Sequence, residues 1–175
     1  MKLKSTLSVL AICAAVPAVA DCGMVRFSDV GWTDITATTA ATSLVLEALG
    51  YETSTDILSV PVTYASMAQG DIDVFLGKWM PTMEGDIASY REAGTVDTVR
   101  VNLEGAKYTL ATNAAGVAAG ITDFASIAAA ADALDSKIYG IEAGNDGNRL
   151  IQDMIDSGSF GLDGFEVVES SEQGM

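Results

Sequence analysis

Two tryptophans, Trp32 and Trp79, occupy equivalent places in the chain, each in a loop just after a short apolar segment typical of a β-strand. They are the only tryptophans in the sequence. In open α/β sheets, ligands bind beyond the carboxyl ends of the strands, where such loops lie. A lone tryptophan at such a place is most often half-buried packing. Two of them favour a shared ligand site, although their spacing does not say which ligand binds.

Aromatic side chains suggest the chemistry of that site. The faces of aromatic rings attract cations that hydrogen bonds do not hold, above all quaternary ammonium groups, at about 0.5–2 kcal/mol per contact. Tyr108 is a third aromatic residue, at a predicted crossing between two parts of the chain, and Asp34 would add charge and accept a hydrogen bond from a hydroxyl group. The remaining tyrosines are predicted to pack inside the protein: Tyr51, Tyr64, Tyr90 and Tyr139.

A polar loop, Gly144–Asn148, precedes a predicted helix. Free N–H groups at such a helix start can bind an anion. The loop lacks the Gly-Lys-Ser/Thr sequence of a phosphate-binding loop. From the motif alone we favour ordinary capping of the helix by Asn145 or Asp146.

Residues for catalysis are scarce. The chain contains no histidine, which excludes histidine-dependent catalysis. Cys22 has no neighbouring base, and Asp71 and Asp73 share one face at the start of a strand, where solvated or capping roles are favoured over acid–base work. We therefore predict no catalytic residues, no metal ligands and no cofactor.

Predicted strands and helices alternate along the chain, which is typical of an α/β fold with parallel sheets. Asp34 is predicted to cap the first helix, and Asp123 the helix over 124–134. The first helix is predicted to contribute apolar side chains to the core through Leu44, Val45, Leu46 and Leu49. Extended segments are predicted over 96–103 and 107–112, with a crossing between two lobes near 107–113. The predicted strands cover 24–28, part of 51–60, 73–76, 137–142 and 165–168, and the predicted helices cover 35–49, 61–69, 83–92, 124–134 and 148–157.

The chain is strongly acidic, with 24 acidic and 9 basic residues and a net charge of −15. Nucleic acid is excluded as a partner, because binding phosphates requires basic patches. An acidic surface favours the approach of a cation. Keeping an exported protein in solution explains the acidity equally well.

Residues 1–20 have the pattern of a secretory signal peptide. Lys2 and Lys4 give a positive start, residues 7–16 form a short apolar run, and small residues precede a cleavage site after Ala20. The apolar run is too short to span a bilayer. We therefore predict export to the periplasm in soluble form.

Two observations predict that a C-terminal part is absent. Cys22 would be the only cysteine after export, which suggests a missing partner. Residues 170–173 resemble the start of a capped helix, and the sequence stops two residues later at Met175.

Four segments occur together and in order: Ser28–Asp34, Asp71–Pro81, Gly105–Tyr108 and Gly144–Asn148. Through them the chain resembles the substrate-binding proteins of ABC transporters for quaternary amines, and the resemblance extends to the end of the sequence.

The resemblance implies an α/β fold of two lobes, the type II fold of periplasmic binding proteins. Lobe 1 would cover residues 21–108, and lobe 2, incomplete in this chain, would cover 109–175. Members of the family continue further, and their additional residues would complete lobe 2, return to lobe 1, and bring another box tryptophan and a partner for Cys22.

The resemblance also implies a ligand and a partner. The ligand would be choline, enclosed by an aromatic box, and the partner would be the permease of an ABC transporter in the inner membrane. Trp32, Trp79 and Tyr108 would form the box, and Asp34 and Asn145 would contact the hydroxyl end of choline.

Three alternatives stay open. The ligand could be another quaternary amine such as glycine betaine, although Asp34 would repel its carboxylate. The chain could be a non-functional fragment of a receptor. An enzyme acting on a small amine, with Asp34 or another acid as its base, is the least favoured.

Overall fold

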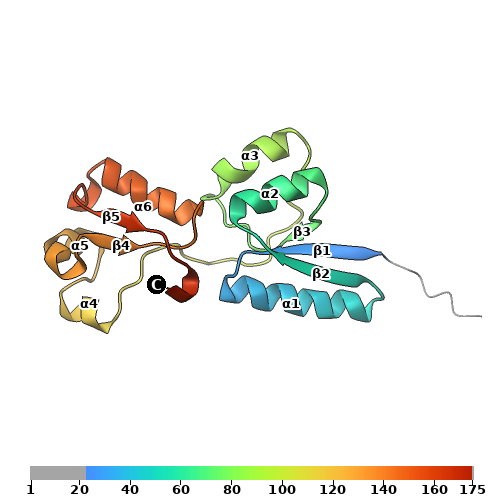
Figure 1. Ribbon diagram of the computed structural model, residues 1–175, viewed down its shortest axis with the longest axis horizontal. Coiled ribbons are helices and arrows are strands. Elements are labelled where there is room, and N and C mark those ends of the chain that lie inside the picture. Colours follow the sequence, from blue (N-terminus) through green and yellow to red (C-terminus); the bar gives the residue numbers. More distant parts are fainter. Residues whose placement is uncertain (1–22, 175) are drawn as a thin grey trace, which may run out of the picture.

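The structure, a computed structural model, describes residues 23–174. The predicted signal peptide and Cys22 lie outside the described residues. Two parallel sheets lie at opposite sides of the molecule, each with its own helices (Figure 1). The predicted alternation of strands and helices and the parallel strand pairing are therefore confirmed.

The first sheet has the strand order β2-β1-β3. Strand β1 (Met24–Asp29) lies in the middle, paired along its full length with β2 (Glu52–Ile57) and briefly with β3 (Val74–Phe75). Parallel neighbours require crossover connections. Helices α1 (Thr33–Ala48) and α2 (Val60–Gln69) provide them, and Gly70 ends α2 in a left-handed conformation.

A core lies among α2, α3 (Glu84–Glu92) and the loops that follow the strands of the first sheet. Tyr64 of α2 is buried in it, packed edge-on against Phe75 of β3. The core also includes Trp32, one of the predicted site residues. Its buried members are Val30, Trp32, Ile35, Val60, Tyr64, Met83, Ile87 and Val96.

The second sheet pairs β4 (Lys137–Tyr139) with β5 (Glu166–Val168). Residues 97–113 lead to it without forming a helix or strand. Its core is mostly isoleucine, with Leu162 and Phe165. The helical segments of this half are α4 (Ala114–Ala118), α5 (Phe124–Ile127), the 3-10 helix η1 (Ala128–Leu134), α6 (Asp146–Asp156) and the 3-10 helix η2 (Ser159–Gly161). The last 3-10 helix, η3 (Glu172–Gly174), contacts Gly31 and Thr33 of the first half instead.

Helix α1 corrects two predictions. Asp34 does not cap it, because the helix begins at Thr33 and Trp32 is the N-cap residue, so Asp34 lies in the first turn. The apolar residues predicted to join the core from its second half are exposed instead. The buried residues of α1 are Ile35 and Thr39, whereas the exposed ones include Leu44, Val45 and Leu49.

Segments 96–103 and 107–112, predicted to be extended, form no helix and pair with no strand of the described chain. The second half of the chain corrects two more predictions. The helix predicted over 124–134 is capped by Asp123 as expected, but it changes to a 3-10 helix after Ile127. Tyr139 is exposed, because it alternates along β4 with Ile138, which faces the core.

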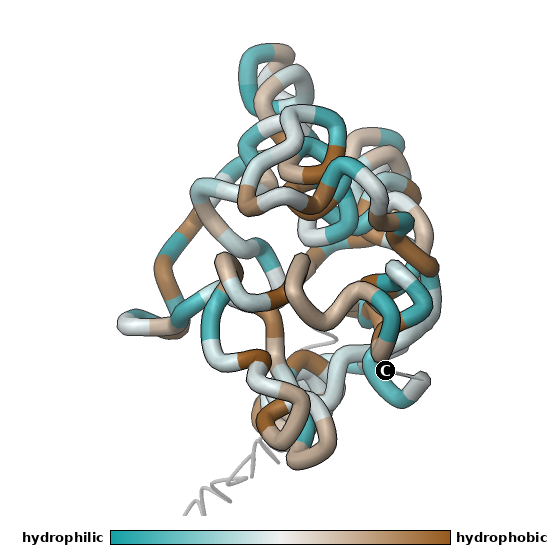
Figure 2. The backbone as a smooth tube through the Cα atoms, turned by 90° about the vertical axis from the view of Figure 1, so that its left-hand side faces the viewer, coloured by the Kyte–Doolittle hydropathy of each residue, from teal (hydrophilic) through white to brown (hydrophobic). Residues whose placement is uncertain are grey.

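Hydropathy changes often along the chain. Figure 2 shows apolar stretches interrupted by hydrophilic ones throughout the molecule. Among residues 23–174, no helix is both long enough and apolar enough to span a membrane.

Candidate functional site

A cavity of about 170 Å³ lies between the two sheets. Side chains from both halves of the chain line it, and all five predicted site residues are among them. The lining residues are Trp32, Asp34, Trp79, Tyr108, Ile141, Asn145, Asp146 and Glu172. The structure therefore brings together residues that are more than 110 positions apart in the sequence.

Trp32 forms a fixed wall of the cavity and is only 8% exposed. Its Nε1–H donates to both carboxylate oxygens of Glu142, at 3.2 and 3.1 Å. The loop that carries it is held by Asp29, whose carboxylate accepts hydrogen bonds from the N–H of Gly31 at 2.8 Å and from the hydroxyl of Thr36 at 2.6 Å. The indole face thus reaches the cavity with its polar group already satisfied.

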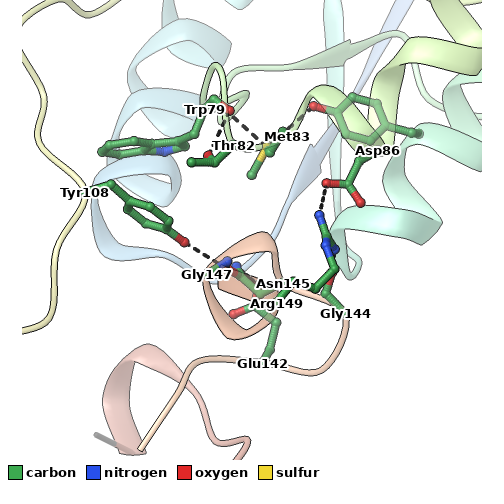
Figure 3. Close-up of polar contacts among 11 residues, drawn as sticks. Trp79, Thr82, Met83, Asp86, Tyr108, Glu142, Gly144, Asn145, Gly147 and Arg149 are labelled. Carbon is green, nitrogen blue, oxygen red and sulfur yellow. Dashed lines mark hydrogen bonds and ion pairs between the residues drawn. The ribbon is translucent and has the colours of Figure 1, made fainter. Parts of the chain in front are cut away.

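Trp79 lies in the loop after β3 (Figure 3). Its N–H donates to the sulfur of Met83 at 3.3 Å, and its carbonyl accepts from the N–H of Met83 at 2.9 Å and the hydroxyl of Thr82 at 3.2 Å. The ring centres of Trp79 and Tyr108 are 5.8 Å apart, with planes inclined by 34°. Two aromatic faces from different halves of the chain therefore meet at the cavity.

Tyr108 is held by one hydrogen bond. Its hydroxyl donates to Oδ1 of Asn145 at 3.1 Å (Figure 3). Burial, together with the carboxylates of Asp146 and Glu142, raises the pKa of Tyr108 to about 12. Gly147 makes this approach possible, because a Cβ atom there would lie 2.3 Å from the Tyr108 hydroxyl oxygen. Gly147 was not among the predicted site residues.

Asn145 connects the polar groups of the site and is 1% exposed. It is the N-cap of α6, as the capping interpretation predicted, with Oδ1 accepting from the N–H of Gly147 at 2.7 Å. Its Nδ2 donates to Glu142 at 2.8 Å. Asn148 fixes the preceding turn through hydrogen bonds with both backbone groups of Ile141.

Carboxylates surround the cavity. Asp34, Asp146 and Glu172 line it, and Glu142 holds Trp32 and Asn145. None of the described residues that line this cavity is basic. The site therefore has a negative potential that attracts cations. Of these four carboxylates, only Asp34 was a predicted site residue. Asp146 belongs to the polar loop, whereas no local pattern marks Glu142 or Glu172 as a site residue.

Polar contacts connect the two sides of the cavity. Arg149 of α6 forms an ion pair with Asp86 of α3 and donates to the carbonyl of Gly144 at 2.9 Å (Figure 3). Near the C-terminus, Glu172 accepts from the N–H of Thr33, and Gln173 donates to the carbonyl of Gly31 at 3.1 Å. The two walls are thus held facing each other.

Residues 23–174 contain no group of three or more His, Cys, Asp or Glu side chains that could hold a metal ion. Aromatic faces and carboxylates without basic side chains suit a small organic cation instead.

Two solved structures of ABC-transporter choline-binding proteins are similar to this chain, one in complex with choline and one in an unliganded semi-closed conformation. Each is 72% identical in sequence, with TM-scores of 0.81 and 0.76, and each match covers 87% of this chain. The chain spans 53% of the length of those proteins. The architecture is that of type II periplasmic binding proteins, of which the chain spans a part.

A shorter relative matches over nearly its whole length. The uncharacterized protein ORF1 of Chromohalobacter salexigens is 51% identical over 150 residues, which cover 84% of this chain and 97% of that protein. The family model for the substrate-binding domain of ABC-type glycine betaine transport systems matches residues 23–175. The chain therefore belongs to this family of substrate-binding domains.

Proposed function

We propose that the protein captures choline and delivers it to the membrane permease of an ABC transporter. One observation carries this proposal: the rings of Trp32, Trp79 and Tyr108 meet carboxylates at a single cavity that has no basic lining residue. The similar protein with bound choline supports it, at 72% identity.

In the proposed complex, the trimethylammonium group lies against the three aromatic faces, each contact contributing about 0.5–2 kcal/mol. The hydroxyl group of choline contacts Asp34 and Asn145. The cavity volume of about 170 Å³ suits a small ligand. For comparison, an apolar cavity of roughly 150 Å³ accommodates benzene.

The proposal includes the location and the two lobes. Residues 1–20 direct the chain to the periplasm, and residues 21–108 and 109–175 form the lobes on either side of the cavity. Choline binds first to one lobe, closure of the lobes buries it, and the permease recognises the closed form. The protein binds its ligand without chemical change and is not an enzyme.

Titration of the purified chain, followed by tryptophan fluorescence, tests the choice of ligand. Choline, acetylcholine and glycine betaine are compared at one pH and ionic strength. We expect choline to bind most tightly, because the carboxylate of glycine betaine would face the acidic cavity. Much tighter binding of glycine betaine than of choline would overturn the assignment.

Glycine betaine is the second candidate ligand, because the matching family model describes glycine betaine transport. The same titration decides between the two amines. Mass spectrometry of the protein incubated with choline checks that no turnover occurs; formation of a product would contradict a binding function.

A further inference from the structure

Asp146 differs from the other carboxylates at the cavity. It is 2% exposed, and both of its carboxylate oxygens are buried without a hydrogen-bond partner among the described residues. By contrast, Glu142 accepts from Trp32 and Asn145, and Glu172 accepts from a backbone N–H. Asp146 is therefore the one carboxylate lining the cavity that is both deeply buried and without a donor in this part of the chain.

Burying a carboxylate without a hydrogen-bond donor destabilises the folded protein unless another group offsets its charge. A buried charge requires a partner or several hydrogen bonds. The only basic residue of α6, Arg149, is directed elsewhere, to Asp86 and the carbonyl of Gly144. The neighbouring N–H of Gly147 is also directed elsewhere, since it donates to Oδ1 of Asn145. The start of a helix favours negative charge, so Asp146 adds to the negative potential of the cavity.

We propose that the Asp146 carboxylate is the electrostatic partner of the ligand's cationic group and makes the site selective for cations over neutral molecules of the same shape. This inference rests on the proposed function and adds a specificity residue to it. Asp34 also lines the cavity, but its side chain is exposed, so water screens its charge. The same charge at a buried position interacts several times more strongly with a nearby cation.

The test compares choline with its neutral isostere 3,3-dimethylbutan-1-ol, in which a carbon atom replaces the charged nitrogen. Binding of both to the full chain is measured by calorimetry for the wild type and for Asp146→Asn, which keeps the shape and removes the charge. The matched control is Asp153→Asn, the same change at an exposed position of the same helix.

We expect Asp146→Asn to weaken choline binding about 30-fold and to leave binding of the neutral alcohol within about threefold of the wild type. Asp153→Asn should change neither. The thermal unfolding midpoint of the ligand-free Asp146→Asn chain should equal or exceed that of the wild type, because the variant no longer buries an unpartnered charge.

Two results would overturn the inference: choline affinity of Asp146→Asn within about threefold of the wild type, or an equal loss for both ligands, which would indicate a role in shape alone. These results differ from a failure of the proposed function. If the wild type binds neither choline nor glycine betaine, the proposed function falls and the inference falls with it. If the wild type binds choline and only the variant behaves otherwise than expected, the inference alone is wrong.

Discussion

The two sides of the cavity are built in different ways. On the side of the first sheet, Trp32 and Trp79 are held by packing: both join the core beneath α2 and α3, and their backbone groups are fixed by short-range hydrogen bonds. On the other side, Asn145 and Tyr108, the last residue of the first proposed lobe, are held by a hydrogen-bond network around the start of α6. The positions of the two tryptophan rings thus depend mainly on the core, with an added hydrogen bond from Trp32 to Glu142, whereas the position of the Tyr108 ring depends on directional polar contacts.

This difference matches the two ends of the proposed ligand. A trimethylammonium group forms no directional hydrogen bonds, so a rigid aromatic wall suits it. A hydroxyl group requires an acceptor at a defined position, which a network provides. We therefore expect changes on the first side to remove affinity outright and changes on the second side to reduce it in steps.

Trp79→Ala should have the largest effect. It removes an aromatic face of the cavity, and we expect choline affinity to fall about 100-fold or more, as for a central aromatic anchor. Trp79→Phe is the control, because it keeps a smaller ring at the same place and should lose less. Fluorescence from Trp32 or calorimetry reports binding in both variants, and an unchanged titration of Trp79→Ala would rule out its role in the box.

Gly147→Ala should have a smaller effect than Trp79→Ala. A Cβ atom there would lie 2.3 Å from the Tyr108 hydroxyl oxygen, so the ring must move away from Asn145. We expect choline affinity to fall roughly tenfold, since misplacing one wall weakens a cation–π contact and a hydrogen bond.

Gly85→Ala is a matched control for this change. Gly85 is also the second residue of its helix, α3, and a Cβ atom there would meet nothing within 4 Å. It should bind choline as the wild type does. If Gly147→Ala binds equally well, Tyr108 is not a fixed wall of the site.

Tyr108→Phe isolates the hydrogen bond from the ring. It keeps the aromatic face and removes the donor to Asn145, so we expect a loss of about 0.5–1.5 kcal/mol in binding, or a few-fold in affinity. Calorimetric titration with choline measures it. A loss as large as that of Trp79→Ala would show that the Tyr108 hydroxyl group matters as much as the aromatic face of Trp79, which would contradict this prediction.

The sequence predicted the first side better than the second, for physical reasons. Trp32 and Trp79 follow apolar strands directly, so local patterns place them at one sheet edge. Glu142 and Glu172 enter the site only through the packing of one half of the chain on the other, which no local pattern records. Asp34 was predicted as the N-cap of α1 but lies two positions further along, because Trp32 takes the N-cap position without a side-chain cap.

The sequence also failed to predict which residues of α1 are buried. The apolar residues in the second half of α1 have the composition of a core face, yet Leu44 and Val45 are exposed. Their burial depends on what covers the helix, and composition does not show that. Similarly, Asn145 was predicted as a cap and also as a ligand contact. Its capping bond is confirmed by the structure, and its contact with ligand stays a prediction.

The smallest expected effect is on the pH dependence of stability, and it belongs to the second side alone. The pKa of Tyr108 is raised to about 12, above its ordinary value near 10. The folded chain therefore keeps the phenolic proton where the unfolded chain has lost it, so the contribution of Tyr108 is present below about pH 10 and is lost as the pH rises toward 12. The pKa of buried Tyr64 is also raised, mainly by burial, so the wild type alone does not isolate Tyr108. The free energy of unfolding should fall more steeply above pH 10 in the wild type than in Tyr108→Phe, and equal slopes would place Tyr108 in free solvent rather than against Asn145.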